Sequence, residues 1–169
     1  MSAQIAVAEK PETELNWGVQ IVRSALSDGG SSWRLPFAPS LQLNKDMRLI
    51  AANYGELIME WNARPHLDSM DGIIQGGILT VLADLCQGHC FSTTLDEPTG
   101  FSTVDFQTRY LRPVPSGQTY TIESRILQRA RKTGLIETWI RRTDGKPTTH
   151  VIGSWKIVDR NFKNLADKG

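Results

Sequence analysis

Asp84 is a carboxylate in the middle of an apolar run, Ile78–Leu85. Burying an unpaired charge is costly, so such a residue needs either a partner or a chemical task. A carboxylate in an apolar setting can act as a general base or as a nucleophile. The spacing alone leaves a second interpretation open, in which Asp84 lies on the one wet edge of a helix or caps a neighbouring loop.

Two adjacent glycines, Gly76 and Gly77, stand directly before this run and are expected to open a helix. The first turn of a helix has free backbone N–H groups and a partial positive charge. Glycine also lets a substrate carbonyl approach the backbone closely, which a side chain would block. The pair is therefore a candidate for polarising a carbonyl oxygen, although many helices begin after glycine.

Cys86, Cys90 and His89 lie close together on the same expected helix. A zinc site needs three or four protein ligands, and the only other histidines are His66 and His150, so we expect no metal site. We interpret the two cysteines as small buried side chains without a disulfide. A pair of Cys86 with a histidine is a weak nucleophile candidate, since a thiol in an apolar stretch is normally inert. The glycine patterns of serine hydrolases, Rossmann folds and P-loops do not occur in the sequence.

The elements that must position these residues follow from the apolar spacing. Two helices are expected, an amphipathic one over residues 11–27 and a buried one over Ile78–Phe91. Residues 33–46 contain two prolines and are expected to be irregular. The segments expected to be strands are 47–61, with a bulge or bend at Gly55, and then 102–112, 118–129, 133–142 and 148–158.

One strand, a long apolar helix and then four strands joined by short turns predict an α+β domain. Four strands in meander imply an antiparallel sheet packed against the helix. The second face of such a sheet needs a cover, which only the N-terminal arm or a second subunit can provide. We therefore expect a homodimer, with a dimer of dimers left open.

Two stretches of the sequence resemble signatures of one family. The run Gly72-Ile73-Ile74-Gln75-Gly76-Gly77, with Asp84 seven residues beyond the second glycine, resembles the Gly-x-x-His-Gly-Gly signature of the PaaI-type (phenylacetate-pathway, 4-hydroxybenzoyl-CoA-like) acyl-CoA thioesterases. The run from Thr103 to Gly117 matches the family's second signature, a strand that ends in Tyr-Leu-Arg-Pro and closes with glycine. Together the resemblance covers roughly residues 47–158.

The resemblance implies a hotdog fold, in which a long central helix is wrapped by an antiparallel sheet of five or six strands. Residues 1–46 would form an added N-terminal helical arm, residues 47–158 the thioesterase domain and residues 159–169 a tail. The implied activity is hydrolysis of an acyl-CoA to the free acid and coenzyme A, with no further cofactor.

The resemblance also implies roles for individual residues. Asp84 falls on the family's catalytic carboxylate, and Gly76 on the glycine whose backbone N–H polarises the thioester carbonyl. Thr103 falls on a hydroxyl that helps to place the attacking water and is usually supplied across the dimer interface. The residues expected to bind the substrate are Ser69, Gln75, Gly77, Arg129, Arg131 and Lys132.

The chain departs from the family pattern at two of these positions. Gln75 replaces the usual histidine, and Ser69 replaces the usual asparagine. A glutamine amide can still donate a hydrogen bond, but its charge does not change with pH. These departures keep two alternatives open: a protein that binds an acyl-CoA or an aromatic ligand without hydrolysing it, and a dehydratase. The dehydratase is the weaker one, because such enzymes need a histidine beside the carboxylate.

The composition restricts the partners. A net charge of +1 on 169 residues argues against nucleic acid or an anionic membrane, and the sequence has neither a signal peptide nor an apolar run long enough to span a membrane, so we expect a cytoplasmic protein. The phosphates of coenzyme A would then need a local basic cluster, either Arg129–Lys132 or the group Arg141, Arg142 and Lys146. Both clusters can also be ordinary solvated strand ends. We expect an aryl or medium-chain acyl pocket lined by Ser69, Ile74, Gln75, Trp33 and Phe37.

Overall fold

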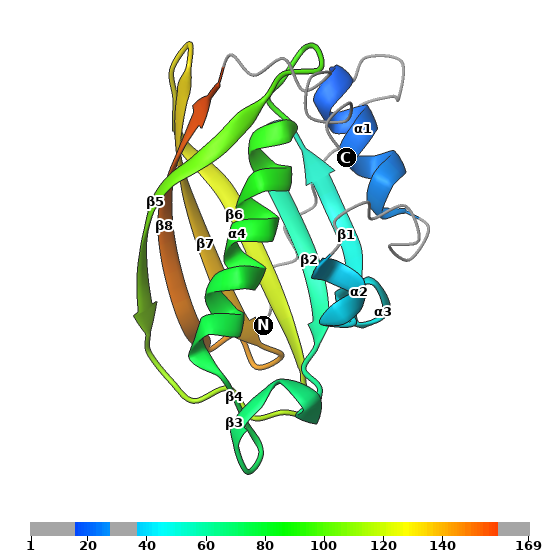
Figure 1. Cartoon of the computed structure of the whole chain (residues 1–169), viewed down its shortest axis with the longest axis vertical. Helices are drawn as coiled ribbons and strands as arrows, with labels where there is room; N and C mark the ends of the chain where they lie inside the picture. The colour runs from blue at the N-terminus through cyan, green and yellow to red at the C-terminus, as the bar shows by residue number, and fades with distance from the viewer. Residues whose placement is uncertain (1–15, 28–36, 159–169) are drawn as a thin grey trace, which may run out of the picture.

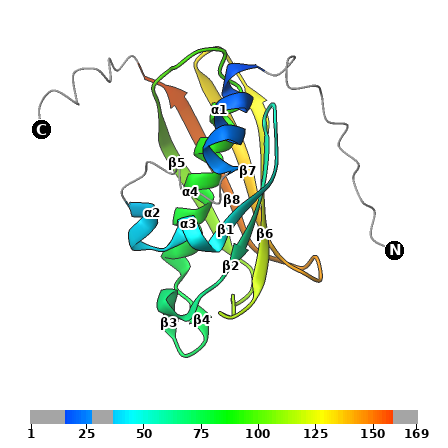
Figure 2. The same cartoon turned by 90° about the vertical axis from the view of Figure 1, so that its right-hand side faces the viewer.

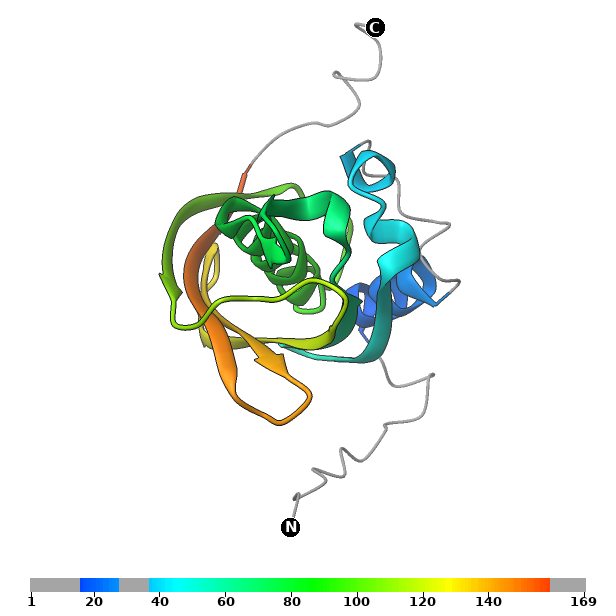
Figure 3. The ribbon, with the colours of Figure 1, turned by 90° about the horizontal axis from the view of Figure 1, so that it is seen from below.

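A computed structural model describes residues 16–27 and 37–158 of the chain. Its centre is one long helix, α4 (Gly76–Ser92), and an antiparallel sheet of six strands curls around it (Figures 1 and 3). The strands of this sheet are β1 (Met47–Asn53), β2 (Glu56–Asn62), β5 (Phe101–Tyr110), β6 (Thr119–Arg129), β7 (Thr133–Arg142) and β8 (Pro147–Ile157). The predicted α+β fold, with a central helix and a sheet of up to six strands, is confirmed.

The central helix forms because its apolar residues cover most of its circumference. Eight of its residues are buried, among them Leu79, Leu82, Leu85 and Phe91. Burying one leucine side chain contributes about 1.5–3 kcal/mol, so packing against the sheet is the main source of this helix's stability. The prediction of a helix over Ile78–Phe91 is confirmed, and the helix also includes both glycines before it.

The strand order in the sheet is β1-β2-β6-β7-β8-β5. The prediction of a four-strand meander is therefore wrong for β5, which pairs with β8 at the far edge instead of with β6 (Figure 1). The chain between β5 and β6 is no hairpin turn, because it crosses the end of α4, where the Ile74 N–H donates to the Val114 carbonyl at 2.9 Å. The unpaired side of β5 consequently lies at the edge of the sheet.

The segment 47–61 is a hairpin of β1 and β2 and not the single bent strand predicted from the sequence. Its turn lies at Tyr54 and Gly55, and Gly55 has a φ of +73°, a conformation that glycine adopts without strain. A register shift between Leu49 and Ala51 marks an irregularity within β1.

The N-terminal arm lies beside β1 (Figure 2). Its described helices are α1 (Trp17–Leu26), α2 (Phe37–Ser40) and α3 (Leu43–Asp46), so part of the segment expected to be irregular is helical. The amide N–H of Gly18 donates to the Leu95 carbonyl at 2.9 Å, which ties α1 to the C-terminal end of α4, away from Gly76. The first residues of the predicted helix 11–27, the tail 159–169 and Trp33 lie outside the described residues, as does the side chain of Phe37.

Loop elements lead into α4. A 3₁₀ turn, η2 (Pro65–Leu67), is followed by a small hairpin of β3 (Asp68–Met70) and β4 (Ile73–Ile74). The Gln75 N–H donates to the Leu67 carbonyl at 2.9 Å, so this hairpin ends at a fixed point directly before the helix.

A buried glutamine links α4 to the sheet. Gln87 is fully buried; its amide oxygen accepts a hydrogen bond from the Trp155 indole N–H at 2.9 Å, and its amide nitrogen donates to the Val151 carbonyl at 3.4 Å. Gly153 leaves the space for this side chain, because a methyl group at residue 153 would collide with the Gln87 amide oxygen and with the ring of Phe106. The glycine therefore fixes how closely β8 approaches the helix.

We expect Gly153→Ala to lower the free energy of unfolding by about 1–3 kcal/mol, the usual cost of overpacking a dense core. Chemical denaturation with a matched Ser154→Ala control measures this, since Ser154 faces outward from the same strand. Equal stability of the two variants would contradict the tight approach of β8 to α4.

Candidate functional site

One face of α4 carries Gly76, Thr80 and Asp84 at intervals of four residues, so the three lie one above the other along the helix. This face lies against β5, because Thr80 contacts Thr108 and Tyr110 of that strand, and Asp84 contacts Thr103. Asp84 therefore lies on the side of the helix that meets the edge strand of the sheet.

A bulge in β5 turns Thr103 toward Asp84. Strict alternation from Thr108 and Phe106, which face the helix, would place residue 104 toward the helix and Thr103 away from it. The register with β8 shifts between Thr103 and Asp105, so Val104 is an extra residue, and Thr103 pairs with the buried Trp155. Bulges commonly reorient a side chain in this way next to functional sites.

The Thr103 hydroxyl donates a hydrogen bond to Asp84 Oδ1 at 2.8 Å. Burial raises the pKa of the Asp84 carboxyl above its ordinary value, and the Thr103 hydrogen bond opposes that rise in part because it stabilises the charged form. The second oxygen, Oδ2, has no hydrogen-bond partner among the residues that the structure describes. Asp84 is thus a half-buried carboxylate with one oxygen anchored and one oxygen left for a further group.

The hydrogen bond between Thr103 and Asp84 lies within one chain. The β5 bulge is the physical reason, because it brings the hydroxyl to the carboxylate without a second copy.

The N-terminus of α4 presents the backbone donors. Helix geometry leaves the Gly76 and Gly77 N–H groups without intrahelical acceptors. The Gln75 side-chain oxygen accepts from the Ile78 N–H at 3.2 Å and so caps the next position. A methyl group at residue 77 would lie 2.7 Å from this oxygen, so the glycine there makes room for the cap. Gln75, expected to contact substrate, thus has a structural task through its oxygen.

Thr80, Thr108 and Tyr110 were not among the predicted site residues. The Thr80 hydroxyl lies 2.9 Å from the Tyr110 hydroxyl and 3.3 Å from that of Thr108. Two signals in the sequence could have found them: Thr80 stands four residues before Asp84, and Thr108 and Tyr110 alternate along the strand that carries Thr103.

Ser69 lies on the β3–β4 hairpin, is exposed, and its hydroxyl donates to the Ile73 carbonyl at 3.4 Å within the hairpin. The neighbouring Asp68 has the larger role in this loop. Its carboxylate accepts from the Gly72 N–H at 3.2 Å and from the Ser116 hydroxyl at 3.0 Å. Asp68 thereby holds the hairpin that leads to Gly76 against the turn before β6.

The basic cluster Arg129–Lys132 lies at the end of the sheet away from Gly76. The Arg129 guanidinium is already engaged there: it donates to the Thr94 hydroxyl at 3.0 Å and stacks on the Phe91 ring, with 4.8 Å to the ring centroid. Arg131 and Lys132 are exposed beside it. Arg129 is therefore a structural residue of this corner.

The alternative basic group lies at the turn between β7 and β8. Arg141 pairs with Glu123 at 3.3 Å, while Arg142 and Lys146 both approach Asp144, at 3.7 Å and 3.6 Å. Each of these three cations has a carboxylate nearby, and that carboxylate would compete with a phosphate for it.

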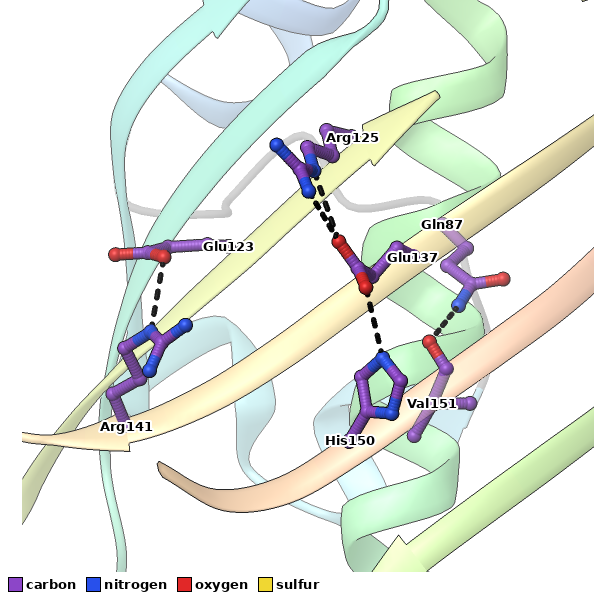
Figure 4. Close-up of polar contacts among 7 residues, drawn as sticks. All are labelled: Gln87, Glu123, Arg125, Glu137, Arg141, His150 and Val151. Carbon is purple, nitrogen blue, oxygen red and sulfur yellow. Dashed lines mark hydrogen bonds and ion pairs between the residues drawn. The ribbon is translucent and has the colours of Figure 1, made fainter. Parts of the chain in front are cut away.

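The histidine and cysteine candidates are separated by the sheet. Figure 4 shows His150 on the face opposite α4, where it lies 3.0 Å from Glu137, which also pairs with Arg125 at 2.8 Å. Cys86 is buried in α4, and burial raises the pKa of its thiol. A catalytic pair of these two residues is therefore excluded by position.

His89 is no better a partner, since burial lowers the pKa of its imidazole to about 4. Within residues 16–27 and 37–158, no group of three or more histidine, cysteine, aspartate or glutamate side chains is placed to hold a metal ion. No helix in the same described ranges is long and apolar enough to cross a membrane.

The two candidate groups on α4 are far apart within one chain. Asp84 lies eight residues beyond Gly76, and a rise of 1.5 Å per residue places them about 12 Å apart along the helix. A single carbonyl carbon cannot lie next to both. Each chain therefore presents two half-sites, a backbone donor end and a carboxylate with its threonine.

Comparisons with known proteins give the fold its family context. The family model of the thioesterase superfamily matches residues 71–149, a range that includes Gly76, Asp84 and Thr103. None of the curated protein sequences compared with the chain matches it.

Several solved structures are similar to the chain. The PaaI protein of the Escherichia coli phenylacetic acid degradation operon has a TM-score of 0.71 at 16% identity, covering 85% of this chain and 96% of its own. A Streptococcus mutans UA159 protein bound to acetyl-CoA has a TM-score of 0.63 at 16% identity, covering 67% and 89%. Mouse thioesterase superfamily member 2 has a TM-score of 0.65 at 20% identity, covering 82% and 96%.

At these identities the structural likeness establishes the fold, and the family model adds the sequence pattern of the core. The predicted resemblance is therefore confirmed for the fold and the superfamily pattern: the chain has the hotdog fold, and its residues 71–149 match the model of the thioesterase superfamily.

Proposed function

We propose that this protein hydrolyses an acyl-CoA thioester to the free acid and coenzyme A, with Asp84 as the catalytic carboxylate. The observation that carries the proposal is the half-buried Asp84 carboxylate, anchored by Thr103 on the same helix face as the open N-terminus at Gly76. The match of this region to the thioesterase superfamily supports it. So does the similar fold of a Streptococcus mutans protein with acetyl-CoA bound.

The active unit would be a homodimer. Because Gly76 and Asp84 of one chain are about 12 Å apart, a complete site needs the donor end of one copy and the carboxylate of another. A two-fold axis passing beside Thr80, midway between them along α4, would bring Gly76 of one copy level with Asp84 of the other.

The edge strand supplies a surface for this association. Among the described residues, β5 has no strand paired on its outer side, and an unpaired strand edge is a template for pairing with another chain. Val104, Tyr110 and Leu111 are exposed apolar residues on or directly after this strand, and Met70 is exposed on the adjoining hairpin. Pairing of two β5 strands would cover this edge together with Val104, Leu111 and Met70.

In such a site the thioester carbonyl oxygen would accept a hydrogen bond from the Gly76 N–H. One well-placed donor of this kind contributes about 2.7–4 kcal/mol to stabilising the oxyanion that develops. The free Oδ2 of Asp84 would then act in one of two ways. It would deprotonate a water that attacks the carbonyl carbon, so that the C–S bond breaks and coenzyme A leaves as the thiolate, which takes up a proton. Alternatively, it would attack the carbonyl carbon itself and expel the thiolate, and water would then hydrolyse the resulting mixed anhydride to the free acid. Thr103 would hold the carboxylate in position through its oxygen Oδ1.

The phosphates of coenzyme A would require cations outside the composite site. Arg131 and Lys132 are the proposed phosphate ligands, since both are cationic and exposed at this end of the sheet. In an antiparallel arrangement of two α4 helices, the Arg131 end of one copy would lie toward the Gly76 end of the other, and phosphates would reach it from the composite site. The reaction needs no cofactor, and a cytoplasmic location fits a coenzyme A substrate.

Asp84→Asn should reduce the rate of thiol release from acyl-CoA by about 100-fold or more, the lower end of what a positioned carboxylate contributes. The amide keeps the shape of the side chain but cannot accept a proton or attack. Release of free coenzyme A across a panel of acyl-CoAs measures this, with Asp96→Asn as the matched exposed control. Wild-type protein that binds coenzyme A but releases no thiol would instead favour the non-catalytic binding protein.

Thr103→Val should move the acid limb of the pH–rate profile to higher pH. Burial already raises the pKa of Asp84, and the threonine hydrogen bond lowers it in part, so losing that bond leaves the raising effect unopposed. The ionised carboxylate is the active form, and activity is lost as pH falls through the Asp84 pKa. Thr121→Val, on the outer face of β6, is the matched control; an acid limb that stays in place or moves to lower pH would contradict the role of Thr103.

A further inference from the structure

A pocket opens beside the N-terminus of α4, with Gly76 as part of its wall. Its volume is about 230 Å³. Buried Ile74, Leu79 and Val114 contribute apolar walls, and Tyr110 and Arg112 line it from the end of β5 and the connection that follows. None of the described residues of the N-terminal arm lines it, and neither Ser69 nor Gln75 does; Ile74 lines it.

Tyr110 is the one aromatic residue among the described residues that line this pocket, and it is held at two points. Its hydroxyl lies 2.9 Å from the Thr80 hydroxyl on α4. Its ring packs on the backbone of Gly76 so closely that a methyl group there would be 3.3 Å from the ring carbon Cζ. The residue is nevertheless 54% exposed, so the remaining surface of the ring is free to contact a ligand.

A hydroxyl bridge fixes the ring where it is. Thr80 contacts both Tyr110 and Thr108, which lie two residues apart on β5 and both face the helix. A tyrosine with only two side-chain torsions, anchored at its tip, has little freedom to swing aside. Without the bridge, the ring would be retained only by its contact with the glycine.

We propose that Tyr110, held by Thr80, is the specificity-determining wall that limits the size of the acyl group accepted beside Gly76. The proposal rests on the proposed thioesterase function, since it takes the thioester carbonyl to lie at the Gly76 N–H. From that point an apolar acyl group enters the apolar pocket, while the pantetheine arm leads toward solvent.

The volume sets the class of acyl group. An apolar cavity of about 150 Å³ holds a benzene molecule, so this pocket has room for one six-membered ring with a short linker, or for an aliphatic chain of similar volume. A longer chain would have to displace the Tyr110 ring, which closes the way along α4 toward Thr80. Medium-sized groups are therefore favoured over long saturated chains.

The test is a series of straight-chain acyl-CoAs from acetyl to palmitoyl, with phenylacetyl-CoA added, measured as kcat/KM for each substrate. Wild type should show an optimum at medium size. Tyr110→Ala should raise the ratio of kcat/KM for long over medium chains by about tenfold or more, since single methylene differences in apolar pockets reach that size. An unchanged ratio in a folded Tyr110→Ala protein would overturn the proposal.

The hydroxyl bridge is tested separately with smaller changes that keep the fold. Thr80→Val and Tyr110→Phe each remove the contact and should relax the size limit in the same direction, while the double variant should go no further than either alone. Thr80→Ser keeps the hydroxyl and loses only the methyl group, so it should retain the wild-type selectivity for acyl size. If Thr80 acted only through its methyl group, Thr80→Ser would change that selectivity and Thr80→Val would not. Tyr54→Phe and Thr121→Val are remote controls of the same chemical kind.

A second measurement separates this proposal from the thioesterase function. Alkyl-CoA thioethers of increasing chain length cannot be hydrolysed, so their affinities report binding without the chemical step. One outcome would support the wall and refute the hydrolysis. In it, the wild type hydrolyses no acyl-CoA and its affinity for the thioethers falls beyond a medium chain length, while the affinity of Tyr110→Ala does not fall. Affinities that are equal at all lengths in both proteins would refute the wall.

Discussion

The rigid spacing of two groups on one buried helix constrains everything else in this structure. Gly76 at the start of α4 offers a backbone donor, and Asp84 two turns later offers a carboxylate, and a helix cannot bend to bring them together. The helix face that carries both groups lies against β5, the strand at the edge of the sheet. A reaction that needs both groups on one carbonyl therefore needs two copies of the chain.

The features of the structure that depend on local sequence were predicted well. The apolar spacing of Ile78–Phe91 fixed the helix, and the position of Asp84 within it identified the candidate carboxylate before any contact was known. The later strands were found by their composition, even where β7 mixes charged and apolar residues. That mixing has a simple cause, since Glu137 is matched by His150 and Arg125 on the outer face, so charges occur there at low cost (Figure 4).

The parts that depend on distant segments were missed. Strand order cannot be derived from composition, so the placement of β5 beside β8 was not foreseen. The bulge at Val104 is a matter of register between two strands, and without it alternation would turn Thr103 away from Asp84. The Tyr110 hydroxyl contacts Thr80, which lies on a different element, so the sequence did not indicate this contact. The contacts of Arg129 with Thr94 and Phe91 also join distant segments, so the sequence alone did not indicate them.

The most direct measurement of the composite site is complementation between two inactive variants. Gly76→Pro removes the donor N–H at the first helical position, where proline is tolerated, and Asp84→Ala removes the carboxylate. Unfolded together at equal amounts and refolded, the two chains should recover about a quarter of the wild-type thiol release, because half of the randomly assorted dimers would each carry one intact composite site. Asp84→Ala refolded with the double variant is the control and should recover none. No recovery in the first mixture, with both variants folded and dimeric, would show that each chain acts alone and would contradict this account.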